Sequence, residues 1–147
     1  MADVRSNVHS QDIRSMLAIG RRGQLGLHGL LPWEGHKDPV YKADVENFFR
    51  TTRGHVLLAG PKTARAVPEH ERQFMTVVEL RSHMDPEETL AQFADRVVFI
   101  GGGPPVWDVY APYIRRWDIT RLPYDGEADR WFNPAWLTAA DTVLTRG

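Results

Sequence analysis

The sequence predicts a single α/β domain with a mostly parallel central sheet flanked by helices. Two continuous apolar runs, HVLLAG (55–60) and RVVFI (96–100), are typical of strands buried on both faces, as in a parallel sheet. Helical patterns lie between the predicted strands, and this alternation favours the α/β class. The length of 147 residues and the hydrophobic content of 42% suit one domain with one core.

The predicted elements follow one another closely along the chain. Residues 1–15 are expected to form a flexible arm, and residues 16–147 form the domain. Strands are predicted at 16–20, 55–60, 74–80, 96–100, 116–122 and 140–145. Helices are predicted at 41–52, at 86–93 with a proline in the first turn, and from Pro104 onward. Glycines punctuate the loop that ends in LLPW (30–33), and a polar loop follows it.

Composition excludes several classes of function. The formal net charge of −1 gives no reason to expect nucleic acid or an anionic membrane as a partner. No apolar run approaches the ~20 residues of a membrane span, and the first residues lack the apolar stretch of a signal peptide. The chain has no cysteine, and its six histidines show no metal-ligand spacing. We therefore expect a soluble, cytoplasmic protein without a metal.

Asp44 is a carboxylate inside an apolar helical stripe. Tyr41, Val45, Phe48 and Phe49 recur at helical spacing in YKADVENFFRTT (41–52), and Asp44 lies within their stripe. Because removing a lone carboxylate from water is costly, such a group needs a dedicated partner. A protein arginine, a bound ligand or a frayed, hydrated helix end would each satisfy it, so the residues alone leave these alternatives open.

Two predicted strands end in segments suited to phosphate. Gly101, Gly102 and Gly103 follow one buried strand, where their amides and the start of the next helix could approach an anion; a tight turn would explain them equally well. After HVLLAG, Lys62 and Thr63 could meet phosphate oxygens. Ligands of open α/β sheets bind at the carboxyl ends of the strands, so the two ends together favour a dinucleotide.

In collinear order, these segments resemble dihydrofolate reductase over about residues 16–137. The resemblance rests on LAIGRRGQLGLHGLLPW (17–33), the helix with Asp44 and Phe48, HVLLAGPKT (55–63), VVFIGGGPPVWDVYAPY (97–113) and ITRLPYDGEADRWF (119–132). It implies reduction of 7,8-dihydrofolate to tetrahydrofolate by NADPH, with hydride passing to pterin C6 and a proton reaching N5. It also implies a role in one-carbon metabolism, a small-molecule substrate as the partner, and a monomer or homodimer. As a member of this family the protein would be an antifolate target, although the sequence does not predict its sensitivity.

The resemblance also implies site residues. Asp44 would pair with two N–H groups of the pterin, and Trp33 would frame the pocket and help to hold a water molecule. The implied substrate wall consists of Ala18, Leu25, Val45, Phe48, Arg72, Ile100 and Thr120, with Arg72 gripping the folate α-carboxylate. The implied cofactor site consists of Ala18, Ile19, Gly26, Gly60, Lys62, Thr63, Ile100, Gly101, Gly102, Gly103, Val106 and Trp107.

The chain departs from the pattern of that family at several points. The segment EGHKDPVYKA (34–43) is about six residues longer than expected, so the substrate-side wall is rebuilt. Pro61 replaces the usual basic residue, which leaves Lys62 and Arg65 to select a 2′-phosphate. Trp107 stands where a tyrosine or phenylalanine is usual. The sequence stops at Gly147, before one further edge strand, so a second subunit or the N-terminal arm covers that edge, or it stays exposed.

Two other functions remain open at this level. One is reduction of a ribosylaminopyrimidine phosphate, as in relatives from the riboflavin pathway, and Asp44 argues against it because that acid belongs to a pterin pocket in the resemblance. The other is a weakly active folate- or nucleotide-binding protein. The presence of Trp33, Asp44, Thr120 and the glycine turn in one chain disfavours this alternative.

Overall fold

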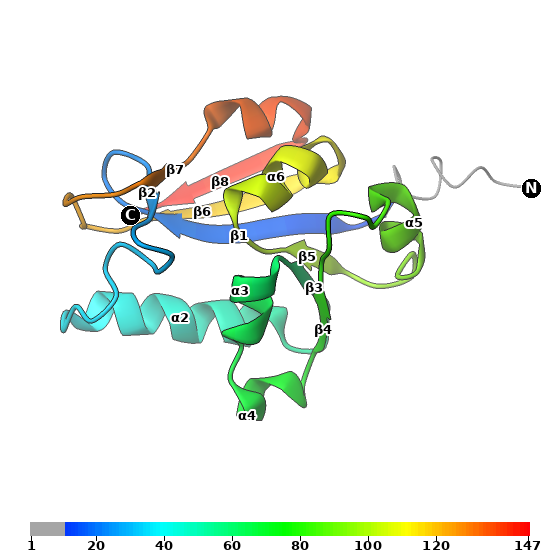
Figure 1. Cartoon of the computed structure of the whole chain (residues 1–147), viewed down its shortest axis with the longest axis horizontal. Coiled ribbons are helices and arrows are strands. Elements are labelled where there is room, and N and C mark those ends of the chain that lie inside the picture. The colour runs from blue at the N-terminus through cyan, green and yellow to red at the C-terminus, as the bar shows by residue number, and fades with distance from the viewer. Residues whose placement is uncertain (1–10) are drawn as a thin grey trace, which may run out of the picture.

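The computed structural model describes residues 11–147 and contains a six-stranded sheet in the order β4-β3-β5-β1-β6-β8. All neighbouring strands of this sheet are parallel, which confirms the predicted fold class (Figure 1). The strands are β1 (Ile13–Ile19), β3 (Val56–Ala59), β4 (Thr76–Glu79), β5 (Val98–Ile100), β6 (Arg116–Arg121) and β8 (Thr142–Arg146). A separate antiparallel ribbon pairs β2 (Gln24–Gly26) with β7 (Arg130–Trp131).

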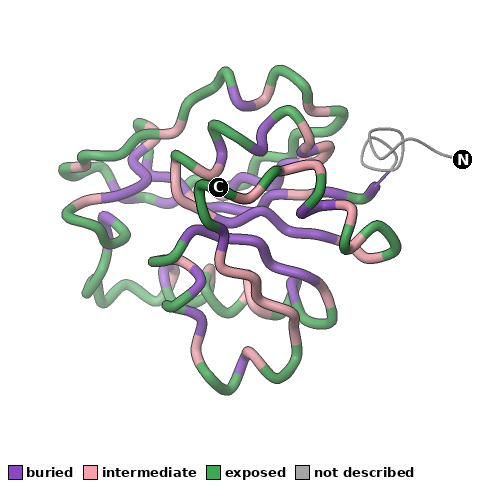
Figure 2. Tube along the Cα trace, turned by 45° about the vertical axis from the view of Figure 1, so that its right-hand side comes forward, coloured by how far each residue is buried: buried purple, intermediate pink, exposed green. Residues whose placement is uncertain are grey.

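Helices cover both faces of the sheet. They are α2 (Pro39–Thr52), α3 (Pro61–Arg65), α4 (Glu69–Arg72), α5 (Pro86–Ala91) and α6 (Pro104–Tyr110), with 3₁₀ turns η1 (Ala111–Tyr113) and η2 (Pro134–Ala139). In Figure 1, α2, α3 and α4 lie on one side of the sheet and α6 lies on the other. Figure 2 shows the buried residues concentrated along the central strands between these two layers.

The core under α6 is built around tryptophans. Trp117 and Trp136 stack with ring centroids 6.4 Å apart, and Trp107 packs against both. The indole of Trp107 donates to the Ser15 hydroxyl at 3.0 Å, and that hydroxyl donates to the Ile100 carbonyl at 2.6 Å. A buried indole N–H needs an acceptor, so this chain of bonds fixes Trp107 beneath the carboxyl end of β5.

The start of α2 is set by its cap. The Asp38 carboxylate accepts a hydrogen bond from the Val40 amide, and Pro39 occupies the first helical position, where its missing N–H is not needed. The helix therefore begins two residues before the predicted one. It ends before Gly54, which has a positive φ of 80°. This placement presents a full four-turn face of α2 to the sheet.

The structure differs from the expected elements in three places. Residues 13–15, expected in the arm, begin β1, because Ile13 and Ser15 are fully buried; residues 1–10 of the expected arm lie outside the described residues. The helices α3 and α4 and the β2–β7 ribbon were not predicted, since elements of two to five residues carry little periodicity. The other elements agree within a few residues.

The last strand, β8, forms an outer edge of the sheet beside β6. All five of its residues are exposed, including Val143 and Leu144. Residues 1–10 lie outside the described residues, so the three alternatives for this edge stay predictions.

Candidate active site

A notch in the sheet lies where β5 ends and β1 continues. β1 pairs with β5 only through Ile13–Ser15, whereas its pairing with β6 continues to Ile19. The Ile19 carbonyl accepts from the Leu122 amide at 2.8 Å and so points toward β6. Because backbone groups alternate in direction along a strand, those of Ala18 point to the opposite side, into the notch. Of the two backbone positions that the resemblance implied, Ala18 faces the notch and Ile19 does not.

The glycine turn Gly101–Gly103 closes the bottom of the notch. The Gly60 amide donates to the Gly102 carbonyl at 2.9 Å, which ties the ends of β3 and β5 together. A Cβ on Gly101 would lie 3.2 Å from the Cβ of Ala59, and one on Gly102 would lie 3.2 Å from the Trp107 ring. At Gly103, by contrast, a Cβ would meet nothing within 4 Å. The turn is therefore packed from below and open above, as a backbone surface for a ligand must be.

One side chain of α3, Thr63, flanks this turn, and a second, Lys62, lies against the loop before Trp33. The Thr63 hydroxyl lies 3.6 Å from the place that a Gly102 Cβ would take. The Lys62 ammonium lies 2.6 Å from the place of a Cβ on Gly29, a residue with a positive φ of 79° in the loop before Trp33. Val106 covers Gly60 from the α6 side, 3.3 Å from the corresponding position. The structure thus brings together six implied cofactor positions, Gly60, Thr63, Gly101, Gly102, Gly103 and Val106, and directs Lys62 toward Gly29.

Asp44 lies half-buried on α2 and has no hydrogen bond or ion pair within residues 11–147. Burial raises the pKa of its carboxyl above the usual 3.8. Among the arginines that the structure describes, none therefore forms a salt bridge with Asp44. A desolvated carboxylate without a partner is suited to bind a ligand that brings two N–H donors.

An aromatic wall stands next to Asp44. Trp33 is buried and stacks on Tyr41, one helical turn before Asp44, with ring centroids 5.7 Å apart and planes 19° apart. Trp33 also meets the edge of Tyr124 at 5.9 Å. The ring of His36, from the long 34–43 segment, lies 5.3 Å from Tyr41. The additional residues therefore pack against the outside of this wall and support it.

The implied substrate residues divide into two groups. Ala18 packs against the aromatic wall and pairs in register with Thr120, and both are partly exposed. Val45 is 43% exposed, although it lies on the apolar stripe. Phe48 and Phe49 both pack against the buried cluster on the α2 side of the sheet, with their ring centroids 5.2 Å apart.

Other implied residues are not available to a ligand as side chains. Leu25, Ile100 and Trp107 are buried in the core on the α6 side of the sheet. Gly26 lies in the β2–β7 ribbon, where its carbonyl accepts from the Asp129 amide at 2.8 Å. These four residues shape or support the notch without lining it through a free side chain.

Arg72 is partly engaged within the protein. Its guanidinium donates to the Val67 carbonyl at 3.2 Å and to the Ala64 carbonyl. These bonds use Nε and Nη2, whereas no described residue bonds to Nη1. The grip of Arg72 on a folate α-carboxylate therefore stays a prediction.

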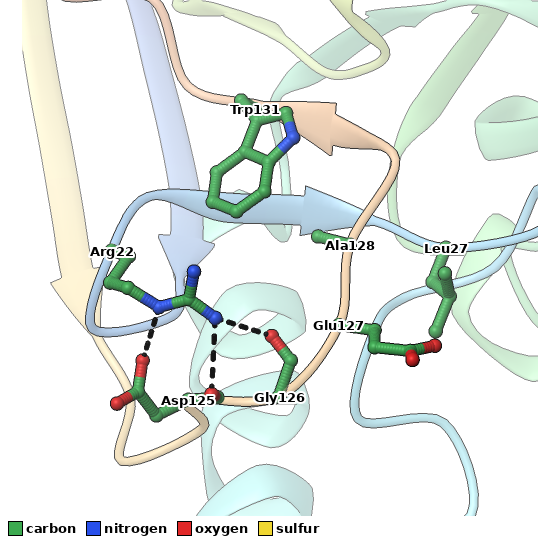
Figure 3. A pocket seen from close by; sticks show the side chains of 7 residues that line it. All are labelled: Arg22, Leu27, Asp125, Gly126, Glu127, Ala128 and Trp131. Atoms are coloured by element: carbon green, nitrogen blue, oxygen red, sulfur yellow. Dashed lines mark hydrogen bonds and ion pairs between the residues drawn. The ribbon is translucent and has the colours of Figure 1, made fainter.

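A second depression lies at the ribbon and contains none of the implied catalytic residues (Figure 3). It has a volume of about 510 Å³. Arg22 bonds to the Asp125 carboxylate at 2.7 Å and to the Gly126 carbonyl at 2.9 Å across its floor. The His28 amide also donates to the Asp129 carboxylate at 3.0 Å. These bonds fasten the glycine loop that carries Gly29 to the segment before β7.

The described residues add two negative findings. Within residues 11–147, no helix combines the length and apolar character that crossing a membrane requires. The same residues contain no group of three histidine, aspartate or glutamate side chains placed to hold a metal ion.

Comparison with known proteins identifies two pterin reductases. No family model matches the chain. A protein of Methylorubrum extorquens named dihydromethanopterin reductase is 60% identical over 126 residues, which cover 86% of this chain and 93% of that protein. A Staphylococcus haemolyticus protein named dihydrofolate reductase is 26% identical over 131 residues, which cover 82% of this chain and 75% of that protein. Both relatives are oxidoreductases named for a dihydropterin substrate.

Proposed function

This chain belongs to the family of dihydromethanopterin reductase, and on that premise we propose that it reduces the C6–N5 double bond of a dihydropterin, with dihydromethanopterin as the leading substrate. The observation that carries this proposal is the half-buried, unpartnered Asp44 beside the aromatic wall. The flat aminopyrimidine edge of a pterin offers two parallel N–H donors, which match the two oxygens of one carboxylate. The bound ring would then lie between α2 and the end of β1.

Asp44 both orients the ring and supports its protonation. Two charge-assisted hydrogen bonds fix the ring in its plane, and the negative charge raises the basicity of the heterocycle. Reduction adds a hydride at C6 and a proton at N5, so the proton must reach a nitrogen away from the carboxylate. Trp33, held by Tyr41 and Tyr124, frames a pocket in which a water molecule carries that proton.

The residues of the notch fit a nicotinamide nucleotide, which supplies the hydride when it is bound. The open upper side of the glycine turn permits close backbone approach, and the Ala18 backbone faces the same space. Thr63 stands beside the turn and Lys62 lies against the loop that carries Gly29, and we assign phosphate contact to both. Arg65 is already paired with Glu79 at 2.8 Å, whereas no described residue bonds to Lys62, so we assign selection of the 2′-phosphate of NADPH to Lys62.

Dihydrofolate is the second candidate substrate. The 26% identity to a dihydrofolate reductase favours it, together with the shared need for a pterin-binding carboxylate. The engagement of two Arg72 N–H groups by backbone carbonyls weighs against it, because fewer donors remain for the carboxylate of the folate tail.

The proposal is tested by following NADPH consumption with a panel of dihydropterins. We expect oxidation of NADPH only when a 7,8-dihydropterin is present, and a higher kcat/KM with dihydromethanopterin than with dihydrofolate. Binding of a dihydropterin without consumption of NADPH would support a binding protein instead and overturn the proposal.

Cofactor choice is tested at one side chain. Lys62→Met should raise the KM for NADPH about tenfold, because a 2′-phosphate loses a charge-assisted contact, and should leave the KM for NADH nearly unchanged. Arg65→Met, from the same helix, is the matched control with little expected effect. Equal losses with both cofactors would remove the assignment of Lys62.

A further inference from the structure

His36, from the long 34–43 segment, completes an arrangement of four rings. Its ring centroid lies 5.3 Å from that of Tyr41 and 5.7 Å from that of Tyr124. Trp33 meets the same two tyrosines, at 5.7 Å and 5.9 Å. These separations are those at which aromatic rings attract one another. Each tyrosine therefore contacts both Trp33 and His36, and we call the four residues the aromatic quartet.

The members of the aromatic quartet differ in their exposure to solvent. Trp33, Tyr41 and Tyr124 are each less than 10% exposed, although they come from three separate segments of the chain. His36 is exposed. It therefore forms the outer side of the quartet and covers the two tyrosines there.

A backbone turn sets the position of the His36 ring. The His36 amide donates to the Trp33 carbonyl at 2.9 Å, so residues 33–36 form a four-residue turn. Gly35, its third residue, has a φ of 84°, as a type II turn requires at that position. A Cβ on Gly35 would meet nothing within 4 Å, so the backbone angle and not crowding calls for glycine. The turn thus brings His36 back onto the tyrosines that support Trp33.

The aromatic quartet adjoins the pterin pocket. Tyr41 precedes Asp44 by three residues, so their side chains are neighbours on one face of α2. Ala18, whose backbone faces the notch, packs against the buried members of the quartet. The Tyr124 hydroxyl donates to the Glu127 carbonyl at 2.6 Å, which anchors this ring from the other side. A change in the orientation of the quartet rings therefore alters the wall beside Asp44.

We propose that His36 is a positioning residue that holds Trp33, through Tyr41 and Tyr124, in the orientation that frames the pterin pocket. The inference rests on the proposed reduction of a dihydropterin, in which Trp33 helps to hold the water molecule that carries a proton to N5. Without the His36 ring, both tyrosines lose an aromatic neighbour on their outer side. Trp33 then loses a fixed support, and proton delivery becomes slower.

The kinetic test uses 6-methyl-7,8-dihydropterin with NADPH. His36→Ala should lower kcat/KM for the pterin about tenfold, because two ring contacts are lost. The solvent deuterium isotope effect on kcat/KM should rise, since proton delivery limits the rate more strongly. His36→Phe keeps a ring at this position and should restore both quantities. Lys37→Ala, at the next exposed position of the chain, is the matched control and should behave as wild type.

A second variant removes the contact without removing the imidazole. Gly35→Ala places a Cβ on a residue with positive φ and so strains the turn that carries His36. We expect the same loss of kcat/KM as in His36→Ala. Near-ultraviolet circular dichroism provides a readout that needs no turnover. The contribution of Trp33, obtained by difference from Trp33→Phe, should weaken in both variants and persist in His36→Phe.

The outcomes separate this inference from the proposed function. If wild type reduces no dihydropterin, the proposed function fails, and the dichroism of the variants still tests whether His36 positions Trp33. If His36→Ala keeps the kcat/KM, the isotope effect or the dichroism of wild type, the role of His36 is overturned. Failure of His36→Phe to restore them overturns it equally. The Kd for NADPH, measured by calorimetry, should not change, and a loss parallel to that of kcat/KM would mark a general disturbance of the fold and contradict positioning.

Discussion

Two acids on the α2 side of the sheet, Asp44 and Asp118, differ in whether the protein provides a partner for the carboxylate. On the half covered by α2, Asp44 is desolvated and has no partner among the described residues. On the half formed by β6 and β8, Asp118 is 6% exposed and lies 3.2 Å from Arg116 and 3.5 Å from Arg146. Asp118 is the register partner of Met16, so its side chain emerges on the α2 side of the sheet.

This difference teaches which buried acid belongs to a site. Both carboxylates lose water, and burial alone does not separate them. Asp118 recovers that cost inside the protein through two guanidinium groups, and the pair closes a sheet surface that no described helix covers. Asp44 has no such partner among the described residues, so only a bound ligand could offset the cost of its desolvation. Three substitutions test this distinction.

Asp44→Asn should have the largest effect. Because the amide cannot accept two parallel hydrogen bonds from the ring or favour its protonation, kcat/KM for the dihydropterin should fall by about 100-fold or more. The Kd for NADPH should change little, since Asp44 lies on the other side of the notch. Steady-state kinetics and cofactor titration measure both quantities, and a parallel loss of the two would contradict the role of Asp44.

Asp118→Asn should affect stability and leave turnover within about twofold of wild type. Removal of this charge leaves two arginines without their shared partner, so the free energy of unfolding should fall by about 1–2 kcal/mol. Asp141→Asn is the matched control, since Asp141 pairs with Arg115 at 3.0 Å but is exposed. Urea unfolding of wild type and the two variants measures the free energy of unfolding. An equal loss in both variants would contradict the larger role assigned to the buried Asp118.

The smallest effect concerns pH. Burial raises the pKa of Asp44 in the folded state, so the folded protein holds this proton more tightly than the unfolded chain does. The contribution of Asp44 to stability is therefore most favourable below the unfolded pKa and is lost as the pH rises through the folded pKa. Asp44→Asn should be more stable than wild type at neutral pH, and the advantage should vanish in acid. Denaturant unfolding at several pH values measures it; a constant difference would contradict the desolvation of Asp44.

Much of this arrangement could be predicted from local sequence. The apolar runs located β3 and β5, and the helical stripe located α2 and placed Asp44 within it, because both periodicities report one-sided or two-sided burial. Side-chain direction could not be predicted in the same way. Arg72 fitted a carboxylate clamp by position, but its bonds to the Ala64 and Val67 carbonyls depend on where α3 ends, which the sequence does not reveal.

The remaining differences between the predicted and the observed positions of side chains come from long-range packing. Leu25 lies in a loop-like segment of the sequence, but ribbon pairing with residues more than a hundred positions away buries it on the α6 side. The burial of Glu71 could not be predicted, since this residue lies on a four-residue helix whose buried face cannot be inferred from periodicity. In the sequence, Trp107 matched a cofactor position, and only its bond to Ser15 shows that it supports the turn from beneath.

The position of Lys62 against Gly29 has a thermodynamic consequence. This flexible cation lies against the loop that leads to Trp33, and the next residue, Thr63, lies beside the glycine turn. If Lys62 contacts the cofactor phosphate as proposed, the phosphate would draw the ammonium away from that loop, and we expect occupancy of the cofactor site to change affinity for the pterin. Such linkage is reciprocal: whatever factor a nucleotide imposes on pterin binding, the pterin imposes on the nucleotide.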